Sequence, residues 1–208
     1  TISRMQELGR AYPNAGYGYN LYHTWLMSSN PKPYNSYGNG SAMRVSPVAW
    51  VAESEEQLKE LSLMVTDVTH NHPEGIKGAE AIAMGIYLAR QGKSKEEIRE
   101  KLSVYYPILK DKFFTIKSLC GNYGYDFAGG WVTCQGSVPQ AIIAFLESEN
   151  FEDAIRNAIS IGGDSDTIAA ITGSIAEGYY GISDDMKETA LSYLDDYLLD
   201  IVEKINFI

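Results

Sequence analysis

Apolar residues recur at helical spacing through most of the chain, with polar residues between them. The pattern is clearest in residues 53–70, 75–91 and 151–161, where apolar positions fall three or four residues apart and line one face of a helix. No long segment alternates between apolar and polar residues, as a half-buried strand would. The pattern therefore predicts an all-α protein, folded as a compact orthogonal or up-down multi-helix bundle.

Capping residues predict where several of these helices begin. Ser54 and Ser94 each precede a Gln or Glu by three residues, which is the spacing of a capping box. Asn150 and Ser183 also stand directly before helical patterns and are good N-cap residues. Each of these four residues is expected to satisfy backbone amides in the first turn of its helix, because those amides have no partner within the helix.

Helix breakers and apolar runs predict the remaining boundaries. Pro73 is expected to stop the helix before it, and Pro139 to lie in the first turn of the helix that carries the apolar run 141–146. A largely apolar run over residues 42–51 is expected to be helical. The chain is expected to close with one amphipathic helix over residues 184–205.

The stretch IGGDSDTIAAITGSIAEGYYG, residues 161–181, holds the most unusual chemistry. Its run of small residues predicts a central helix that neighbouring helices approach closely, with Asp164 at its N-cap. Asp164 and Asp166 are two residues apart and do not share a helix face, so they converge only if the chain turns into the helix between them. Gly162 and Gly163 permit such a turn, which would gather two carboxylates and the Thr167 hydroxyl.

Two interpretations of these acids are open from the residues alone. Acids at a helix start cap it and offset the positive end of its dipole. Alternatively, they bind a metal ion, since carboxylate and hydroxyl oxygens are the ligands that hard cations prefer. One aspartate is enough for a cap, and two acids at the start of a nearly uncharged helix repel each other unless a cation lies between them. Caps are far commoner than metal sites, and this redundancy is what supports the metal interpretation beside the cap.

Two further segments carry candidate binding groups. The sequence Gly38-Asn39-Gly40-Ser41 opens the apolar run 42–51 and would present several backbone amides together, as a cradle for a phosphate or ribose. The alternative is a glycine loop that only turns the chain. His70 and His72 are candidate metal ligands, or else they make polar contacts or cap a helix C-terminus.

Composition narrows the class of protein. The chain has 208 residues, which predicts one domain over residues 1–208. Its net charge of −10 argues against general binding to nucleic acids. No apolar stretch is long enough to span a membrane, and Cys120 and Cys134 are expected to be free thiols in a reducing compartment, so we expect a cytoplasmic protein. Several tyrosines near glycines could stack on a base or sugar, although most are expected to be ordinary packing residues: Tyr17, Tyr19, Tyr37, Tyr123, Tyr125, Tyr179 and Tyr180.

With these segments assembled, the chain resembles the ADP-ribosylglycohydrolase family, including the dinitrogenase reductase-activating glycohydrolases. The resemblance is carried, in order, by GNGSAMRVSPVAW (38–50), VTHNHPEGIKGAEAIA (68–83), SVPQAIIAFLES (137–148) and GGDSDTIAAITGSIAEGYYG (162–181). It implies the all-α fold of that family and a pair of bound Mg²⁺ or Mn²⁺ ions. It also implies hydrolysis of the bond between ADP-ribose and a protein side chain or small acceptor.

The resemblance also implies roles for individual residues. It makes Asp164, Asp166 and Thr167 metal ligands. On the enzyme hypothesis, Asp164 or Asp166 is also the catalytic residue that orients a metal-bound water toward the anomeric carbon, and the sequence does not choose between them. It puts Gly38, Asn39, Gly40, Ser41, Met43 and Arg44 near the ADP-ribose, and His70 in the lining of the same cleft.

One departure from the family pattern changes what we expect of the metal site and of the protein surface. The family's N-terminal segment, with its Thr-Asp-Asp-Thr motif, has no counterpart here, so the chain corresponds to the C-terminal two-thirds to three-quarters of the pattern. Asp164, Asp166 and Thr167 would then form half of a dinuclear site. The surface left by that segment would favour a homo-oligomer or a separate partner segment.

Two alternatives to the enzyme therefore stay open: a module that binds ADP-ribose or a nucleotide without turnover, and an inactive truncated homologue. The acceptor could be arginine, serine, a DNA base or a free metabolite. Loops over residues 28–37 and 108–131 are expected to distinguish these acceptors.

Overall fold

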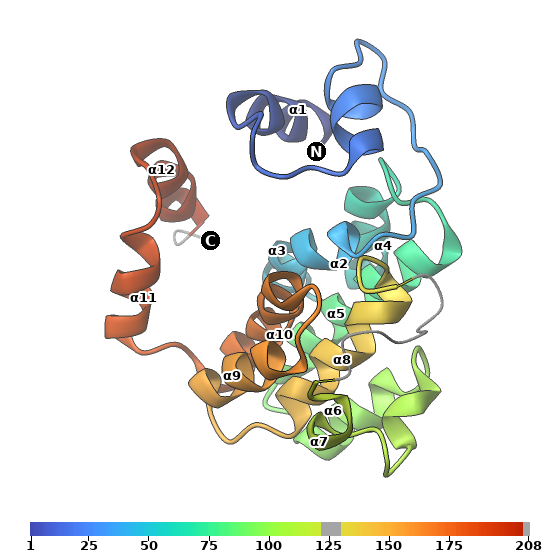
Figure 1. Cartoon of the computed structure of the whole chain (residues 1–208), viewed down its shortest axis with the longest axis vertical. Coiled ribbons are helices and arrows are strands. Elements are labelled where there is room, and N and C mark those ends of the chain that lie inside the picture. Colours follow the sequence, from blue (N-terminus) through green and yellow to red (C-terminus); the bar gives the residue numbers. More distant parts are fainter. Residues whose placement is uncertain (122–129, 206–208) are drawn as a thin grey trace.

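The computed structural model describes residues 1–121 and 130–205 of the chain, and these residues fold into helices joined by loops (Figure 1). No strand occurs in these two ranges, although an isolated antiparallel bridge joins Gly38 to Thr133. The all-α prediction is confirmed. Tyr123, Tyr125 and most of the glycine-rich part of the 108–131 loop lie outside the described residues.

The helices follow one another in a simple order along the chain. The elements are α1 (Ile2–Ala11), η1 (Asn20–Leu26), α2 (Gly40–Arg44), α3 (Ser46–Val51), α4 (Glu55–Thr66), α5 (Pro73–Arg90), α6 (Lys95–Leu102), η2 (Pro107–Lys110), α7 (Ile116–Leu119), α8 (Cys134–Leu146), α9 (Phe151–Ile161), α10 (Ser165–Tyr180), α11 (Asp184–Leu191) and α12 (Asp196–Ile205).

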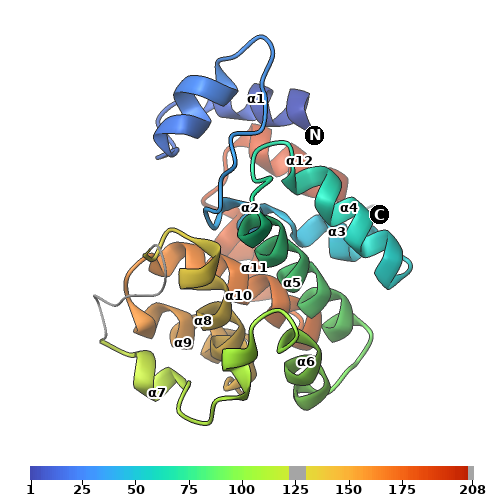
Figure 2. The ribbon, with the colours of Figure 1, turned by 90° about the vertical axis from the view of Figure 1, so that its right-hand side faces the viewer.

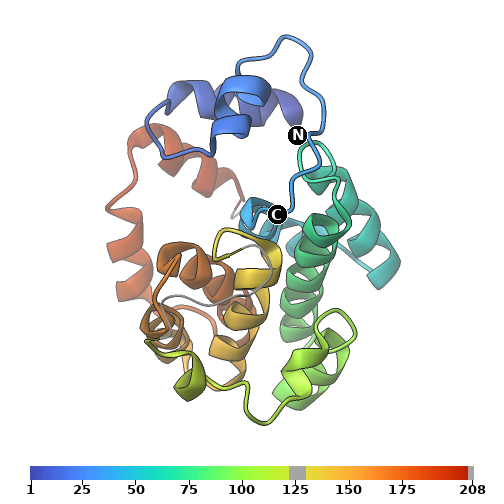
Figure 3. The same cartoon turned by 45° about the vertical axis from the view of Figure 1, so that its right-hand side comes forward.

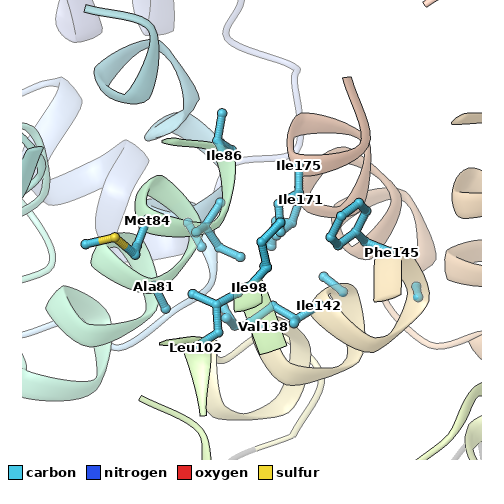
Figure 4. Packing of buried hydrophobic residues seen from close by; sticks show 14 of the residues in the cluster. Ala81, Met84, Ile86, Ile98, Leu102, Val138, Ile142, Phe145, Ile171 and Ile175 are labelled. Carbon is cyan, nitrogen blue, oxygen red and sulfur yellow. The ribbon is translucent and has the colours of Figure 1, made fainter. Parts of the chain in front are cut away.

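The core lies where α5, α8 and α10 pack against one another. Figure 2 shows α5 between α4 on one side and α8 and α10 on the other, and α9 covers the outer side of α10. Figure 4 shows the apolar side chains that fill this junction, including Ile86, Ile142 and Ile171. Nearly every residue of α8 is buried, which explains why its sequence is apolar all round and not amphipathic.

The small residues of α10 allow its neighbours to approach closely, as predicted. A methyl group built on Gly173 would lie 3.1 Å from Cδ1 of Ile155 in α9, and one on Gly178 would lie 3.3 Å from the carbonyl oxygen of Ile86 in α5. Thr172 donates from its hydroxyl to the Ala141 carbonyl of α8 at 3.1 Å. The prediction of a central helix that its neighbours approach closely is confirmed, since α10 contacts α5, α8 and α9 extensively and α2 as well.

Several predicted helix boundaries are wrong, because a cap or a proline acts inside the pattern. Pro139 lies in the interior of α8, which begins at Cys134 since Thr133 accepts from the Gly136 amide and caps it. The predicted helix over 184–205 is two helices, because the carboxylate of Asp195 accepts from the Leu198 amide and starts α12. Ser183 precedes α11 without a side-chain cap bond. The run 42–51 likewise divides at Val45 into α2 and α3.

The two ends of the described chain meet away from the core, as Figure 3 shows for α1 and α12. The Tyr12 hydroxyl bonds to the Asp195 carboxylate at 2.7 Å, the Tyr197 hydroxyl donates to Glu7 at 2.9 Å, and the two tyrosine rings stack at 6.4 Å. Trp25 of η1 donates from its ring nitrogen to the Val68 carbonyl at 2.8 Å. A helix able to cross a bilayer is absent from the described ranges.

Candidate functional site at the start of α10

Two glycines turn the chain into α10. Gly162 and Gly163 have φ angles of +81° and +65°, in the left-handed region that side chains rarely adopt. The ring of Trp131 covers Gly163 so closely that a methyl group built there would lie 2.4 Å from a ring carbon. The turn therefore needs glycine for its backbone conformation and for the space that Trp131 occupies. It brings Asp164 to the N-cap position and Asp166 into the first turn.

The carboxylate of Asp164 does not make the bond that the cap interpretation expects. It accepts no hydrogen bond from the amides of α10. Instead, its Oδ2 accepts from Nδ2 of Asn39 at 2.7 Å. Asp166 is exposed, and the buried hydroxyl of Thr167 lies 3.7 Å from Sδ of Met43. The acidic start of α10 therefore faces residues 39–43, although more than 120 residues separate the two segments.

The loop at residues 38–41 is held by bonds to two other segments. The backbone amide of Asn39 donates to the Val132 carbonyl at 2.9 Å. The side-chain nitrogen of Asn39 donates to the Trp131 carbonyl at 3.2 Å as well as to Asp164. Ser41 is fully buried and donates to the Gly75 carbonyl at 2.9 Å. The predicted amide cradle therefore lacks the Asn39 amide, and the Ser41 hydroxyl is used inside the protein.

The Arg44 guanidinium points into the C-terminal end of α4. Its Nη2 donates to the hydroxyl of Thr69 at 2.7 Å and to the carbonyls of Val65 and Thr66 at 3.2 and 3.4 Å. Burial lowers the pKa of Arg44 to about 10, so the group is still cationic at neutral pH. Helix C-terminal carbonyls favour a cation in this position.

His70 is buried between this arginine and the 38–41 loop. Its Nδ1 lies 2.6 Å from Oγ1 of Thr69, and its Nε2 faces the glycines, since methyl groups built on Gly38 and Gly40 would lie 3.5 and 3.6 Å from it. Burial, and secondarily the nearby Arg44 charge, lower the pKa of His70 to about 3. The imidazole is therefore neutral at physiological pH.

His72 has a different task from the one expected. Its Nδ1 accepts from the Glu74 amide at 3.1 Å and so caps the N-terminus of α5, whereas the sequence suggested a helix C-terminus. Its ring also lies 5.1 Å from that of Tyr37.

The site thus gathers the 38–43 loop, His70 and the start of α10 in one place. Sequence reasoning missed Trp131 and Thr69, which hold the Gly163 turn and the His70 ring. Trp131 follows Gly130 directly, and Thr69 precedes His70, but neither position carries a local pattern that marks a site. Only contacts between distant segments identify them.

The donor groups at the start of α10 suit a hard cation in kind. Asp164, Asp166 and Thr167 offer carboxylate and hydroxyl oxygens, the ligands that Mg²⁺ and Mn²⁺ take. Within residues 1–121 and 130–205, no three His, Cys, Asp or Glu side chains gather closely enough to hold a metal ion. The described residues therefore supply part of the roughly six oxygens that such an ion takes.

Comparison with known proteins finds relatives whose names describe ADP-ribosyl hydrolysis. Among relatives, the ADP-ribosylhydrolase ARH3 of Gallus gallus is 27% identical and covers 86% of this chain and 62% of its own length. The ADP-ribosylarginine hydrolase Tri1 of Pseudomonas putida is 30% identical, covering 86% and 48%. The ADP-ribosyl-[dinitrogen reductase] glycohydrolase of Rhodospirillum rubrum is 26% identical, covering 76% and 51%. The chain thus spans about half to three fifths of these relatives.

A solved structure described as an ADP-ribosylglycohydrolase-related protein complex has the same fold. It superposes with a TM-score of 0.67 over 86% of this chain and 62% of that chain, at 23% sequence identity. Residues 4–206 match the family profile described as ADP-ribosylglycohydrolase. Because that match extends over almost the whole sequence, the chain belongs to the ADP-ribosylglycohydrolase family.

Proposed function

We propose that this chain hydrolyses the glycosidic bond between ADP-ribose and an acceptor, either a protein side chain or a small molecule. The observation that carries the proposal is the 2.7 Å hydrogen bond between Asn39 and Asp164, because it joins the glycine loop to the acidic start of α10. Family membership and relatives whose names describe ADP-ribosyl hydrolysis support the same reaction class.

Asp164, Asp166 and Thr167 would hold Mg²⁺ or Mn²⁺. Such an ion, when bound, polarises oxygens and lowers the pKa of water. The chain's own contribution is electrostatic and positional. Asn39 fixes one carboxylate oxygen of Asp164, and Asp164 and Asp166 together offset the positive charge that develops on the sugar ring as the glycosidic bond breaks. One of the two aspartates orients the attacking water.

The remaining predicted binding residues divide by what their side chains already contact. Met43 contacts Thr167 and Tyr37 contacts His72, but both side chains are partly exposed beside the loop and offer that exposed surface to a ligand. His70 offers a neutral ring nitrogen toward Gly38 and Gly40. Arg44 and Ser41, by contrast, are occupied by internal carbonyls, so we assign them to holding the loop and His70 in place.

Substituting each aspartate tests the proposed reaction. Asp164→Asn and Asp166→Asn keep side-chain size but remove charge, and Asp67→Asn, exposed after α4, is the matched control. Release of ADP-ribose from arginine-linked and serine-linked peptides is measured with Mg²⁺ or Mn²⁺ present. We expect release to fall about 100-fold or more in the two site variants and to be unchanged in the control. Equal rates in all four proteins would contradict the proposal.

A second candidate function is an ADP-ribose or nucleotide-binding module without turnover. It is favoured by the exposed ring of Tyr37, which adjoins Gly38 and offers a stacking surface. Calorimetry with ADP-ribose separates the two functions. Binding that is unaffected by EDTA, with no release of ADP-ribose from either peptide, would support the module, whereas release that EDTA abolishes would support the enzyme.

Two broader assignments belong to the same proposal. We infer that residues 1–208 act as one domain, since α1 and α12 contact each other and the family match runs from 4 to 206. We also infer a reducing compartment such as the cytoplasm, because Cys120 and Cys134 are both free thiols. A homo-oligomer stays a prediction, and analytical ultracentrifugation tests it.

A further inference from the structure

We propose that Thr69 is a positioning residue that holds the His70 imidazole as the Nε2–H tautomer, and that Arg44 orients Thr69 for this task. The three side chains form a buried relay from the end of α4 to the glycine loop. The relay itself is independent of the reaction. Its consequence for ligand binding rests on the function proposed above.

The first step of the relay is the contact between Arg44 and Thr69. Nη2 of Arg44 lies 2.7 Å from Oγ1 of Thr69. A guanidinium has donors and no acceptor, so the Thr69 oxygen must be the acceptor in this bond. The hydroxyl hydrogen of Thr69 cannot point to Arg44 and has to find another partner. Thr69 is fully buried, so leaving that hydrogen unpaired would be costly.

The second step is the contact between Thr69 and His70. Nδ1 of His70 lies 2.6 Å from the same Oγ1, a short hydrogen-bond distance. Oγ1 has a second lone pair and could accept from Nδ1–H as well, but its own hydrogen would then have no acceptor, because Oγ1 has no third hydrogen-bond partner among the described residues. The hydroxyl therefore donates to Nδ1, which carries no proton. A neutral imidazole keeps its single proton on the other nitrogen, Nε2.

The doubly protonated ring does not fit this place. It would need Nδ1 to donate, and it would put a second positive charge next to Arg44. Burial and that neighbouring charge both hold the pKa of His70 far below its ordinary value. The tautomer is therefore set by the relay over the whole physiological range of pH.

The Nε2–H group of His70 points toward the glycine loop at residues 38–41. Methyl groups built on Gly38 and Gly40 would lie 3.5 and 3.6 Å from Nε2, in van der Waals contact with it, so the two glycines keep side-chain atoms away from this nitrogen. The site therefore presents an N–H donor without charge at this point. It selects an acceptor oxygen of the ligand and rejects a donor group, and the opposite tautomer would reverse that selection.

The tautomer can be observed without any ligand. Long-range ¹H–¹⁵N correlation spectra distinguish Nδ1–H from Nε2–H, and the chain has only three histidines, so a His70→Asn spectrum assigns the signals. We expect Nε2–H in the wild type and in Thr69→Ser, which keeps the hydroxyl. Thr69→Val has the same shape without the hydroxyl, and we expect a mixture or Nδ1–H.

Wild-type Nδ1–H, or Nε2–H retained in folded Thr69→Val, would overturn the proposal. The wild-type spectrum shows which tautomer His70 adopts even if the Thr69→Val variant does not fold.

Ligand affinity gives the second readout. By calorimetry, we expect Thr69→Val to weaken ADP-ribose binding about tenfold and Thr69→Ser to restore it. Equal affinities of wild type and Thr69→Val, with the tautomer changed, would overturn the positioning role. If wild type shows the Nε2–H tautomer but binds no ADP-ribose, the proposed function fails while the relay stands.

Discussion

At the scale of single residues, the site depends on glycines as much as on its functional side chains. Gly163 has both a left-handed backbone and the Trp131 ring against it, whereas Gly181 has a similar φ of +73° and open space around it. Substituting Gly163 would cause both backbone strain and a steric conflict, whereas substituting Gly181 would cause backbone strain alone. Comparing the two substitutions therefore separates these effects.

We predict that Gly163→Ala destabilises the fold more than Gly181→Ala does. Backbone strain at positive φ costs roughly 1–3 kcal/mol and applies to both variants. The conflict with Trp131 adds about 1–3 kcal/mol in Gly163→Ala only. Urea denaturation measures the two free energies of unfolding. Equal losses would mean that Trp131 does not cover the turn.

Also at the residue scale, His70 gives stability a pH dependence. Its pKa is about 3 in the folded chain and near the ordinary 6.5 in the unfolded chain, because burial and Arg44 oppose protonation only when folded. The unfolded state therefore takes up a proton that the folded state does not, and stability falls as the pH drops below 6.5 toward 3.

We predict that His70 contributes up to about 1.4 kcal/mol per pH unit to this loss between pH 5.5 and 4. His70→Gln should flatten the dependence by that amount, measured as the free energy of unfolding against pH. His23→Gln is the control, since His23 is exposed. A His70→Gln slope equal to that of wild type would show that the imidazole is not buried as a neutral ring.

At the scale of elements, α8 is stabilised at its C-terminal end by a lysine from another helix. Lys95 of α6 donates to the carbonyls of Leu146, at 3.1 Å, and Ser148. Its ammonium also lies 5.3 Å from the centre of the Phe145 ring and 5.4 Å from that of Tyr180. The Lys95 ammonium therefore interacts both with the negative end of the α8 dipole and with the faces of two aromatic rings.

We predict that Lys95→Met lowers the free energy of unfolding by about 1–2 kcal/mol, since it removes the charge while keeping an apolar chain. Lys93→Met is the matched control. Lys93 is on the surface with only an exposed ion pair to Glu97 at 3.2 Å, and its loss should change stability by less than about 0.5 kcal/mol. Similar losses for both variants would argue that the α8 terminus does not depend on Lys95.

At the scale of the whole molecule, the helices near the two ends are attached less firmly than the core. No residue of α11 is buried, and the links between α1 and the α12 region include exposed hydrogen bonds from Tyr12 and Tyr197. By contrast, α5, α8 and α10 share the apolar junction shown in Figure 4. Regions with few buried contacts open at lower free energy than the core does.

We predict that Tyr12→Phe combined with Tyr197→Phe speeds amide hydrogen exchange in α1 and α12 and leaves exchange in α5 and α8 unchanged. Both substitutions keep the stacked rings and remove only the hydroxyl bonds to Asp195 and Glu7. Exchange monitored by mass spectrometry on proteolytic fragments measures it. Faster exchange in α5 and α8 as well would contradict the prediction that α1 and α12 open independently of the core.

The sequence by itself determined the helical class, several helix starts and the types of donor group at the start of α10. Ser54, Ser94 and Asn150 each accept from an amide three residues later, as predicted, because a cap depends only on residues within one turn. The close approach of α9 and α5 to α10 likewise followed from its small residues, since Gly173 and Gly178 lie against Ile155 and Ile86.

Only the tertiary structure decided what the polar groups of the site contact. Asp164 faces Asn39, Arg44 points into the end of α4, and Trp131 closes over Gly163. These partners come from segments far apart in the sequence, and no local pattern states which helix ends will meet. Local order depends on neighbours along the chain, whereas the direction of a buried polar side chain depends on which distant carbonyl or carboxylate the packing brings within hydrogen-bonding distance.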